Sequence, residues 1–310
     1  MSECKSSGST DPIRRRHFRQ KIAPAPLNAA QAAALYIGGA SEYDRRSPRQ
    51  SFEFAGPTDS AQVPITTVTL QPDRGSAGHW IAESHEWSIH DNEVHVWRID
   101  VAQQRTRPGQ LREWLAPEDL DRAARLRMEM DRDRCLIGRA HLRRLLGIAL
   151  ALPPRSVPIR ADEFGKPYLP CAPMQFNLSH SGNFVLFSIC RSARVGIDVE
   201  CVRALDNVEG MAQIVLAPSE RDDVLCRSGD DRQRTFLRYW TCKEAYAKGR
   251  GMGMSLDFRT IEFTLRDGAA LAGGSANRPW RVVELDVAGN YASAVAVEAE
   301  DFTLVQWDVA

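Results

Sequence analysis

The stretch Gly196-Ile197-Asp198-Val199-Glu200 carries the pattern on which the fold and the site depend. Its β-branched residues are typical of a strand, in which side chains two positions apart project from the same face. Asp198 and Glu200 are therefore expected on one face, while Ile197 and Val199 face a core. Two neighbouring carboxylates repel each other unless a cation lies between them. An isolated pair of this kind also fits an exposed acidic strand, so the pair alone does not decide between these structures.

A second stretch, Trp240-Thr241-Cys242-Lys243-Glu244-Ala245-Tyr246-Ala247-Lys248, adds a third carboxylate and a lysine. It lies in a predicted helix over 233–248, on which Glu244 and Lys248 share one face at a spacing of four residues. Lys243 lies about 100° from the Glu244 direction, so we expect it to have a supporting role only. An anchoring tryptophan followed by an ordinary Glu–Lys pair would also explain this stretch. The two stretches combined predict a metal and phosphate site shared between a strand and a helix.

The composition argues against several classes of function. The 310 residues include 40 Lys+Arg and 40 Asp+Glu, so no overall field favours nucleic acid or an anionic membrane. The seven cysteines contain no Cys-x-x-Cys pair, which indicates free thiols in a reducing compartment rather than disulfides or a zinc site. No apolar run approaches the ~18 residues that span a bilayer, and the N-terminal arginines precede no apolar signal segment. We therefore expect a cytoplasmic protein that does not bind membranes.

Pattern and composition divide the chain into three parts. We expect residues 1–90 to form a largely disordered N-terminal extension, with a short helix around 28–35 and a strand around 63–70. Residues 91–192 and residues 193–310 each predict strands, then helices, then strands again. This order indicates an α+β fold made of two similar halves, of which the second carries the metal site.

Apolar periodicity and turn residues predict the individual elements. For the first half they predict strands at 94–101, 157–160, 175–178 and 184–190, a helix that begins at Pro117, and a helix over about 131–150. For the second half they predict strands at 195–200, 260–265, 281–285, 291–297 and 302–309, and helices at 218–225 and 233–248.

Two turns upstream of the acidic strand offer groups that suit a phosphate. Asn177-Leu178-Ser179-His180-Ser181-Gly182 places a histidine between two serines, and Phe164-Gly165-Lys166-Pro167-Tyr168 presents Lys166. A Ser–His hydrolase pair is an alternative, but adjacent residues seldom place a hydroxyl on the neighbouring imidazole. Nucleophilic catalysis by Ser179 or Ser181 is therefore disfavoured. His180 also fits a turn histidine whose ring is satisfied by the backbone.

A basic segment lies in the first half. It contains Arg122, Arg125, Arg127, Arg132, Arg134, Arg139, Arg143 and Arg144. Aromatic residues are missing from it and acidic residues interrupt it, so nucleic-acid binding is disfavoured. One or two of these arginines could instead reach a ligand phosphate.

The motifs, in order, resemble those of the 4′-phosphopantetheinyl transferases of the large, surfactin-synthetase-activator type. The matching segments are Pro117-Glu118, Gly138, Gly165-Lys166-Pro167, Asn177–Gly182, Gly196–Glu200 and Trp240–Lys248. The resemblance covers about residues 92–300. It implies two pseudo-twofold-related α+β halves in one chain, with coenzyme A in the cleft between them, and we expect a monomer.

The resemblance also implies an activity and its partners. The 4′-phosphopantetheine arm of coenzyme A would be transferred to a serine of an apo acyl or peptidyl carrier protein, with release of 3′,5′-ADP. Polyketide, nonribosomal-peptide and fatty-acid synthesis are equally compatible with the sequence. Two other functions stay open: a Mg²⁺-dependent phosphohydrolase acting on a nucleotide, and a carrier-binding module without catalysis.

Roles for individual residues follow from the resemblance. Asp198, Glu200 and Glu244 would bind Mg²⁺, for which carboxylate oxygens are suitable ligands. Glu244 would also accept the proton of the carrier serine, directly or through water, and Lys248 would neutralise the leaving bisphosphate. The residues expected to bind coenzyme A are Arg122, Arg134 and His180 at the 3′-phosphate, Lys166 at the adenine, and Ser179 and Lys248.

Three features of this chain bear on those expectations. Asp119 stands where relatives often have a basic residue, and Cys135 stands where a hydroxyl residue is common, so the details of the 3′-phosphate pocket stay open. The segment 201–225 resembles the region that docks the carrier. Its apolar residues Met211, Ile214, Val215 and Leu216 would equally suit a buried core.

Overall fold

The computed structural model describes residues 66–67, 79–83, 87–162, 165–170, 172–252, 255–265, 269–272 and 279–309. Most of the N-terminal extension expected to be disordered, with the helix around 28–35, lies outside this range. Residues 79–83 and 87–90 of that extension are described, and they include the short strand β2 (Ile81–Ala82) and the buried Ile89. Of the strand predicted around 63–70, the structure describes β1 (Thr66–Thr67).

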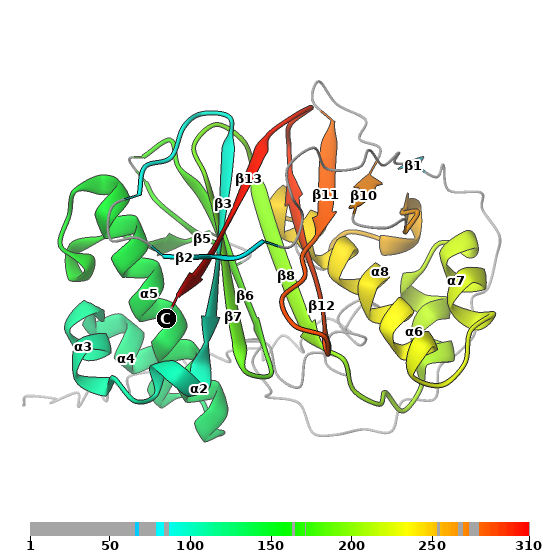
Figure 1. Cartoon of the computed structure of the whole chain (residues 1–310), viewed down its shortest axis with the longest axis horizontal. Coiled ribbons are helices and arrows are strands. Elements are labelled where there is room, and N and C mark those ends of the chain that lie inside the picture. The colour runs from blue at the N-terminus through cyan, green and yellow to red at the C-terminus, as the bar shows by residue number, and fades with distance from the viewer. Residues whose placement is uncertain are drawn as a thin grey trace, which may run out of the picture.

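Two β-sheets face each other at the centre of the molecule, and helices cover the outer side of each (Figure 1). Within the described residues, the five-stranded sheet has the order β2 (Ile81–Ala82), β13 (Thr303–Val309), β3 (Glu93–Asp100), β7 (Phe184–Cys190), β6 (Gln175–Ser181). The four-stranded sheet has the order β10 (Ala269–Ala272), β11 (Trp280–Glu284), β12 (Tyr291–Val297), β8 (Val195–Cys201). Two short pairs, β1 with β9 (Ile261–Glu262) and β4 (Arg160–Ala161) with β5 (Pro167–Tyr168), complete the strands.

The helices fall into two groups that follow the order of the chain. The helices beside the five-stranded sheet are α2 (Val101–Gln104), α3 (Pro108–Trp114), α4 (Pro117–Ala124) and α5 (Glu129–Leu150), followed by the 3₁₀ turn η1 (Pro154–Ser156). Those beside the four-stranded sheet are α6 (Val208–Val215), α7 (Pro218–Leu225) and α8 (Gly229–Arg250), followed by the 3₁₀ turn η3 (Phe258–Thr260).

The two halves repeat one topology, which confirms the predicted α+β fold. In the first half, β3 pairs antiparallel with β7, and β7 pairs antiparallel with β6. In the second half, β8 pairs antiparallel with β12, and β12 pairs antiparallel with β11. Each half places one 22-residue helix, α5 or α8, between its first and its later strands.

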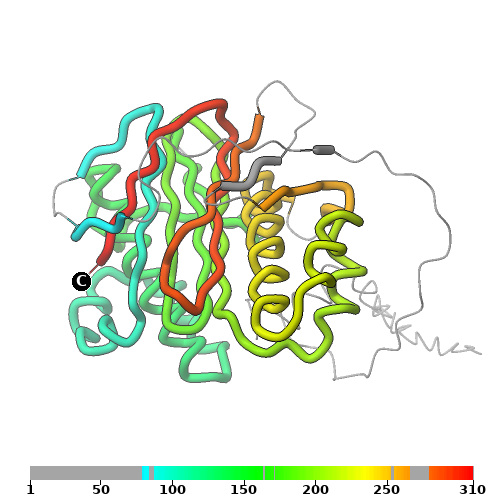
Figure 2. The backbone as a smooth tube through the Cα atoms, turned by 45° about the vertical axis from the view of Figure 1, so that its right-hand side comes forward, coloured from blue at the N-terminus to red at the C-terminus, as the bar shows by residue number. Residues whose placement is uncertain are grey.

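The last strand departs from the predicted division of the chain at residue 192. β13 was expected in the second half, but it lies between β2 and β3 in the first sheet and pairs in parallel with both. Figure 2 shows the C-terminal strand in red crossing back beside the cyan strand β3. An apolar pattern indicates that a segment is a strand, but the partner of that strand depends on contacts across the whole chain. A boundary at residue 192 therefore divides the chain in sequence, but it does not assign every strand to the sheet that contains it.

Two predicted strands differ from the structure, and several short elements were not predicted. The strand predicted at 157–160 is replaced by η1 and the short β4, because Pro153 and Pro154 start a turn there. The strand predicted at 260–265 is reduced to η3 and β9. The short helices α2, α3 and α6 and the strand β10 were not predicted, since segments of four to eight residues show little periodicity.

Apolar clusters join the layers. In the described residues, one cluster packs α5 on the five-stranded sheet, a second packs α8 on the four-stranded sheet, and a third fills the space between the sheets. Met211, Val215 and Leu216 are buried in the second cluster, and Ile214 packs against it. These side chains therefore belong to the core, which was one of the two interpretations of the segment 201–225.

Candidate functional site

The two sheets meet at β6 and β8, which are edge strands of different sheets. Within the described residues these strands share no backbone ladder, and side chains of β6 reach across to β8 instead. Asn177 Oδ1 accepts a hydrogen bond of 2.9 Å from the backbone N–H of Ile197, and Ser181 Oγ accepts one of 3.1 Å from the N–H of Cys201. Alternate residues of a strand share a face, so Asn177, Ser179 and Ser181 form one polar row along this β6–β8 junction.

The same row contacts both carboxylates of the acidic strand. Ser179 Oγ donates to Asp198 Oδ1 at 2.8 Å, and Ser181 Oγ donates to Glu200 Oε2 at 2.8 Å. Asp198 is 3% exposed and Glu200 is 8% exposed. The structure therefore places the predicted pair on one buried face, rather than on the solvent-exposed strand that an isolated pair would also fit.

The helix α8 lies directly on β8 because glycine allows a close approach. A Cβ atom on Gly196 would overlap the backbone of Ala245 and Gly249. The contact brings the polar face of α8 over the acidic strand, where Lys248 Nζ donates to Asp198 Oδ1 at 2.6 Å and to Ser179 Oγ at 3.2 Å. A strand residue and a helix residue that are 50 positions apart thus become direct neighbours.

The charges at this junction do not balance. Burial, together with the negative charge of Asp198, raises the pKa of Glu200 to about 8. Burial also raises the pKa of Glu244 to about 7, although Lys248 opposes the shift. Burial lowers the pKa of Lys248, but the charges of Asp198 and Glu244 outweigh it and the net shift is upward. The carboxyl groups therefore outnumber the one lysine beside them, and Lys248 alone does not hold all of them in the ionised form.

Two carboxylate oxygens here suit a cation. Asp198 Oδ2 and Glu244 Oε1 are buried and have no hydrogen-bond partner among the described residues. Buried polar atoms are almost always paired, and carboxylate oxygens are preferred ligands of Mg²⁺. In the described ranges no group of three His, Cys, Asp or Glu side chains is already arranged to hold a metal ion. The donors fit Mg²⁺ chemically, while the set of three ligands stays a prediction.

Lys166 reaches this region from the first half. Its Nζ donates to Gly249 O at 3.1 Å, at the C-terminal end of α8. Burial lowers the pKa of the Lys166 ammonium to about 8. The lysine thus links the segment that precedes β5 to the helix that carries Glu244 and Lys248. Its predicted contact with adenine stays a prediction.

The three residues predicted to bind the 3′-phosphate lie on three different elements. Arg134 is half-buried on α5, where Nε donates to Gly182 O at 2.7 Å and Nη1 donates to Asp131 Oδ1 at 2.8 Å. It therefore lies at the turn that follows Ser181. Arg122 is exposed on α4. His180 is half-buried and alternates with Ser179, so the two side chains leave β6 on opposite faces.

Asp119 and Cys135 both prove to be buried. Asp119 accepts hydrogen bonds from Arg139, at 2.6 Å, from Arg143, and from the N–H of Ala116 at 3.1 Å. It therefore caps the start of α4 and pairs with two arginines of α5. Cys135 is 5% exposed. The sequence placed Asp119 as an acid in the first turn of the helix that begins at Pro117, which agrees with its cap, but it did not predict the pairing with the arginines of α5.

Lys243 is fully buried on a face of α8 that does not point to the carboxylate site. Its Nζ donates to Phe258 O at 2.7 Å, to Ile261 O at 2.5 Å and to Glu220 at 2.8 Å. These bonds hold α7 and the segment after α8 against the helix. The supporting role expected for Lys243 agrees with these contacts.

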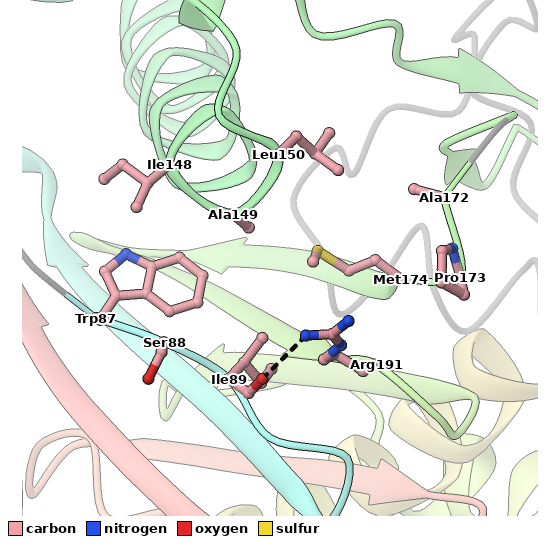
Figure 3. A pocket seen from close by; sticks show the side chains of 10 residues that line it. All are labelled: Trp87, Ser88, Ile89, Ile148, Ala149, Leu150, Ala172, Pro173, Met174 and Arg191. Carbon is pink, nitrogen blue, oxygen red and sulfur yellow. Dashed lines mark hydrogen bonds between the residues drawn. The ribbon is translucent and has the colours of Figure 1, made fainter.

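A cavity of about 260 Å³ lies away from this site (Figure 3). Its wall includes Trp87, Ile148, Leu150, Met174 and Arg191, next to the residues that precede β6. Ser181 ends β6 at the opposite end. None of the predicted site residues lines this cavity.

Comparison with known proteins places the chain among its relatives. Residues 194–296 match the family model described as 4′-phosphopantetheinyl transferase superfamily, and residues 107–191 match the one described as 4′-phosphopantetheinyl transferase, N-terminal. The chain is 33% identical over 223 residues to the 4′-phosphopantetheinyl transferase HetI of Nostoc sp., across 70% of this chain and 93% of that protein. It is 27% identical over 202 residues to the 4′-phosphopantetheinyl transferase Sfp of Bacillus subtilis, across 63% of this chain and 89% of that protein.

Among solved structures, a holo-(acyl-carrier-protein) synthase from Bacillus anthracis in complex with CoA (3′,5′-ADP) aligns with 34% of this chain and 95% of its own, at 22% identity and a TM-score of 0.29. No helix in the described part of the chain has the length and apolar character to cross a membrane. On the identity to HetI and the two family matches, the chain belongs to the 4′-phosphopantetheinyl transferase superfamily.

Proposed function

We propose that this protein transfers the 4′-phosphopantetheine arm of coenzyme A to a serine hydroxyl of an apo acyl or peptidyl carrier protein and releases 3′,5′-ADP. One observation carries the proposal within a chain of this family. Asp198 and Glu200 are buried, and Glu244 half-buried, beside Lys248 at the meeting point of the two halves, and two of their oxygens lack partners among the described residues. A divalent cation shared with a pyrophosphate would supply the positive charge that these carboxylates need in order to ionise together.

We propose that Asp198 and Glu244, with Glu200 as the third donor, would hold Mg²⁺. When bound, the ion would supply the positive charge that offsets the pyrophosphate of coenzyme A and the charge that develops on it. The residues of the chain supply the remaining parts of the chemistry, which are proton acceptance, charge neutralisation and substrate orientation.

Glu244 would accept the proton of the carrier serine, directly or through a water molecule. The serine Oγ then forms a bond to the phosphorus that carries the pantetheine arm, and the bond from this phosphorus to the oxygen of the 3′,5′-ADP leaving group breaks. Lys248 is one helical turn beyond Glu244 and would face the negative charge of the leaving group. The hydrogen bond of Lys248 with Asp198 keeps its ammonium group at the site before substrate binds.

Coenzyme A would lie between the halves, with contributions from both. We propose Arg134, His180 and Arg122 for the 3′-phosphate, and Lys166 for the adenine. Ser179 would contribute through the hydrogen bonds that it makes with Asp198 and Lys248. Since both halves of the site come from one chain, we propose that a monomer suffices for activity.

The test combines the full chain, coenzyme A, Mg²⁺ and an apo carrier protein, followed by intact-mass analysis. Transfer adds about 340 Da to the carrier. Loss of coenzyme A without labelling of the carrier would instead indicate the phosphohydrolase, and neither change would indicate a carrier-binding module. A reaction with excess chelator is the control for the metal. Carriers from polyketide, nonribosomal-peptide and fatty-acid synthesis, assayed side by side, would identify the substrate class.

A further inference from the structure

The β6–β8 junction holds its carboxylates with hydroxyl groups rather than with cations alone. We propose that Ser181 is a positioning residue that fixes the carboxylate of Glu200 for the divalent cation. The proposal rests on the function proposed above and extends it to a residue that does not itself bind metal or substrate.

The hydrogen bonds of Ser181 set the direction of its hydroxyl proton. The backbone N–H of Cys201 donates to Oγ at 3.1 Å, so Oγ is the acceptor in that bond. A serine hydroxyl has one proton, and Ser181 uses it to donate to Glu200 Oε2 at 2.8 Å. The backbone of β8 thus orients the hydroxyl, and the hydroxyl then fixes one oxygen of the neighbouring glutamate.

Ser179 makes the equivalent arrangement two residues earlier. The ammonium group of Lys248 can only donate, so Ser179 Oγ accepts from it at 3.2 Å and donates its own proton to Asp198 Oδ1 at 2.8 Å. The second oxygen, Asp198 Oδ2, is buried without a hydrogen-bond partner among the described residues. In both pairs a serine of β6 holds one oxygen of a β8 carboxylate.

A neutral donor orients a carboxylate without cancelling its charge. Asp119 shows the other outcome, because Arg139 and Arg143 each bond one of its oxygens and neutralise it. Ser181 orients Glu200 without adding a positive charge, so that carboxylate stays available to a cation. Asp198 is held by Ser179 and also by the ammonium group of Lys248, and its second oxygen points to no partner among the described residues. Groups that hydrogen-bond metal ligands commonly change metal affinity by about 10-fold to 100-fold when they are removed.

The experiment measures metal binding directly, with Mn²⁺ as the spectroscopic probe. Electron paramagnetic resonance reports free Mn²⁺ during titration of the full chain, with and without coenzyme A. We expect Ser181→Ala to weaken binding by about 10-fold and Ser181→Thr, which retains a hydroxyl, to bind within about 3-fold of the original chain. Thermal melts of both variants show whether the junction is intact.

Ser188 provides a matched control. It is a fully buried serine of β7, in the same sheet, and its Oγ has no hydrogen-bond partner among the described residues. Ser188→Ala should therefore bind Mn²⁺ as the original chain does. Unchanged affinity in Ser181→Ala would overturn the proposal, as would equal weakening in Ser181→Ala and Ser188→Ala or a lack of rescue by threonine in a folded variant.

The failure of this inference can be distinguished from the failure of the proposed function. If the original chain does not label any apo carrier, the proposed function fails whatever Ser181 does. If the original chain labels a carrier and binds Mn²⁺, but Ser181→Ala binds Mn²⁺ equally well, only the positioning role fails. If the chain labels a carrier without binding Mn²⁺, the positioning role is also overturned.

Discussion

The long helices α5 and α8 occupy equivalent positions in the two halves, yet the buried carboxylates beside them have opposite surroundings. Next to α5, Asp119 is paired with Arg139 and Arg143, and the arginine charges lower its pKa although burial would raise it. Next to α8, Glu200 and Glu244 have raised pKa values because burial and neighbouring carboxylates dominate. Burial is common to both places, and the balance of charge differs.

A balanced buried cluster is costly to break, because removal of one partner leaves an uncompensated charge, whereas an unbalanced cluster is suited to bind a missing charge. The same contrast occurs within α8 itself. Lys243 and Glu220 form a buried pair whose hydrogen-bond partners are within the chain, whereas the next residue, Glu244, has an oxygen with no partner in the described part of the chain. The buried acids with a structural role are thus paired with Arg or Lys side chains, while the candidate functional acids Asp198 and Glu244 each have a carboxylate oxygen with no partner among the described residues.

The largest expected effect is on turnover. Asp198→Ala should lower carrier labelling by at least about 1,000-fold, because it removes a proposed ligand of the cation that stabilises the transition state. The fold should change little, since the mutation removes one carboxylate from a mutually repelling group. Labelling rates at saturating and limiting Mg²⁺, with thermal melts, test both parts. Substantial activity at limiting Mg²⁺ would show that Asp198 is not a ligand.

Asp119→Ala should reduce the stability of the fold and leave the turnover of the folded protein nearly unchanged. It removes the carboxylate that two arginines share, while the fully buried Arg143 keeps its ion pair with Glu118. The free energy of unfolding should therefore fall by about 3 kcal/mol. Urea unfolding measures the loss, and labelling per folded molecule should stay near that of the original chain. If the variant keeps its stability but loses activity, Asp119 acts in the reaction and not in the fold.

Lys248→Ala should lower turnover by about 100-fold, the usual loss for one group that stabilises transition-state charge. The KM for coenzyme A should change less, if the lysine acts on the leaving group. Lys243→Met is the matched change five residues earlier on α8, and it should reduce stability with little effect on turnover of the folded fraction. Weakened coenzyme A binding at unchanged turnover in Lys248→Ala would restrict the lysine to ground-state binding.

The smallest effect concerns pH. The pKa of Asp119 is lower in the folded chain than its ordinary value of 3.8, so the unfolded chain takes up this proton first as pH falls. The stabilisation from Asp119 should therefore be complete above that value and decline below about pH 4. Asp119→Asn should remove this part of the slope. Urea midpoints between about pH 3 and about pH 5 measure it, and equal slopes for both chains would contradict the assignment.

Local pattern was sufficient for many elements and for the composition of the site. The strands predicted at 184–190 and 291–297 match β7 and β12, because continuous apolar runs with clear turns define them. Local pattern did not reveal that β13 joins the first sheet, or that Asp119 pairs with α5. It also gave no role to Ser181, whose importance depends on a hydrogen bond to a strand of the other half.

The sequence by itself determined that Asp198 and Glu200 share a strand face and that Glu244 and Lys248 share a helix face, because these relations depend only on the repeat of each element. The tertiary structure decided that the two faces meet. Their meeting requires α8 to approach β8 closely at Gly196, and it requires β6 to supply hydroxyl groups from the other sheet. Such contacts join residues far apart in the chain, and no local repeat encodes them.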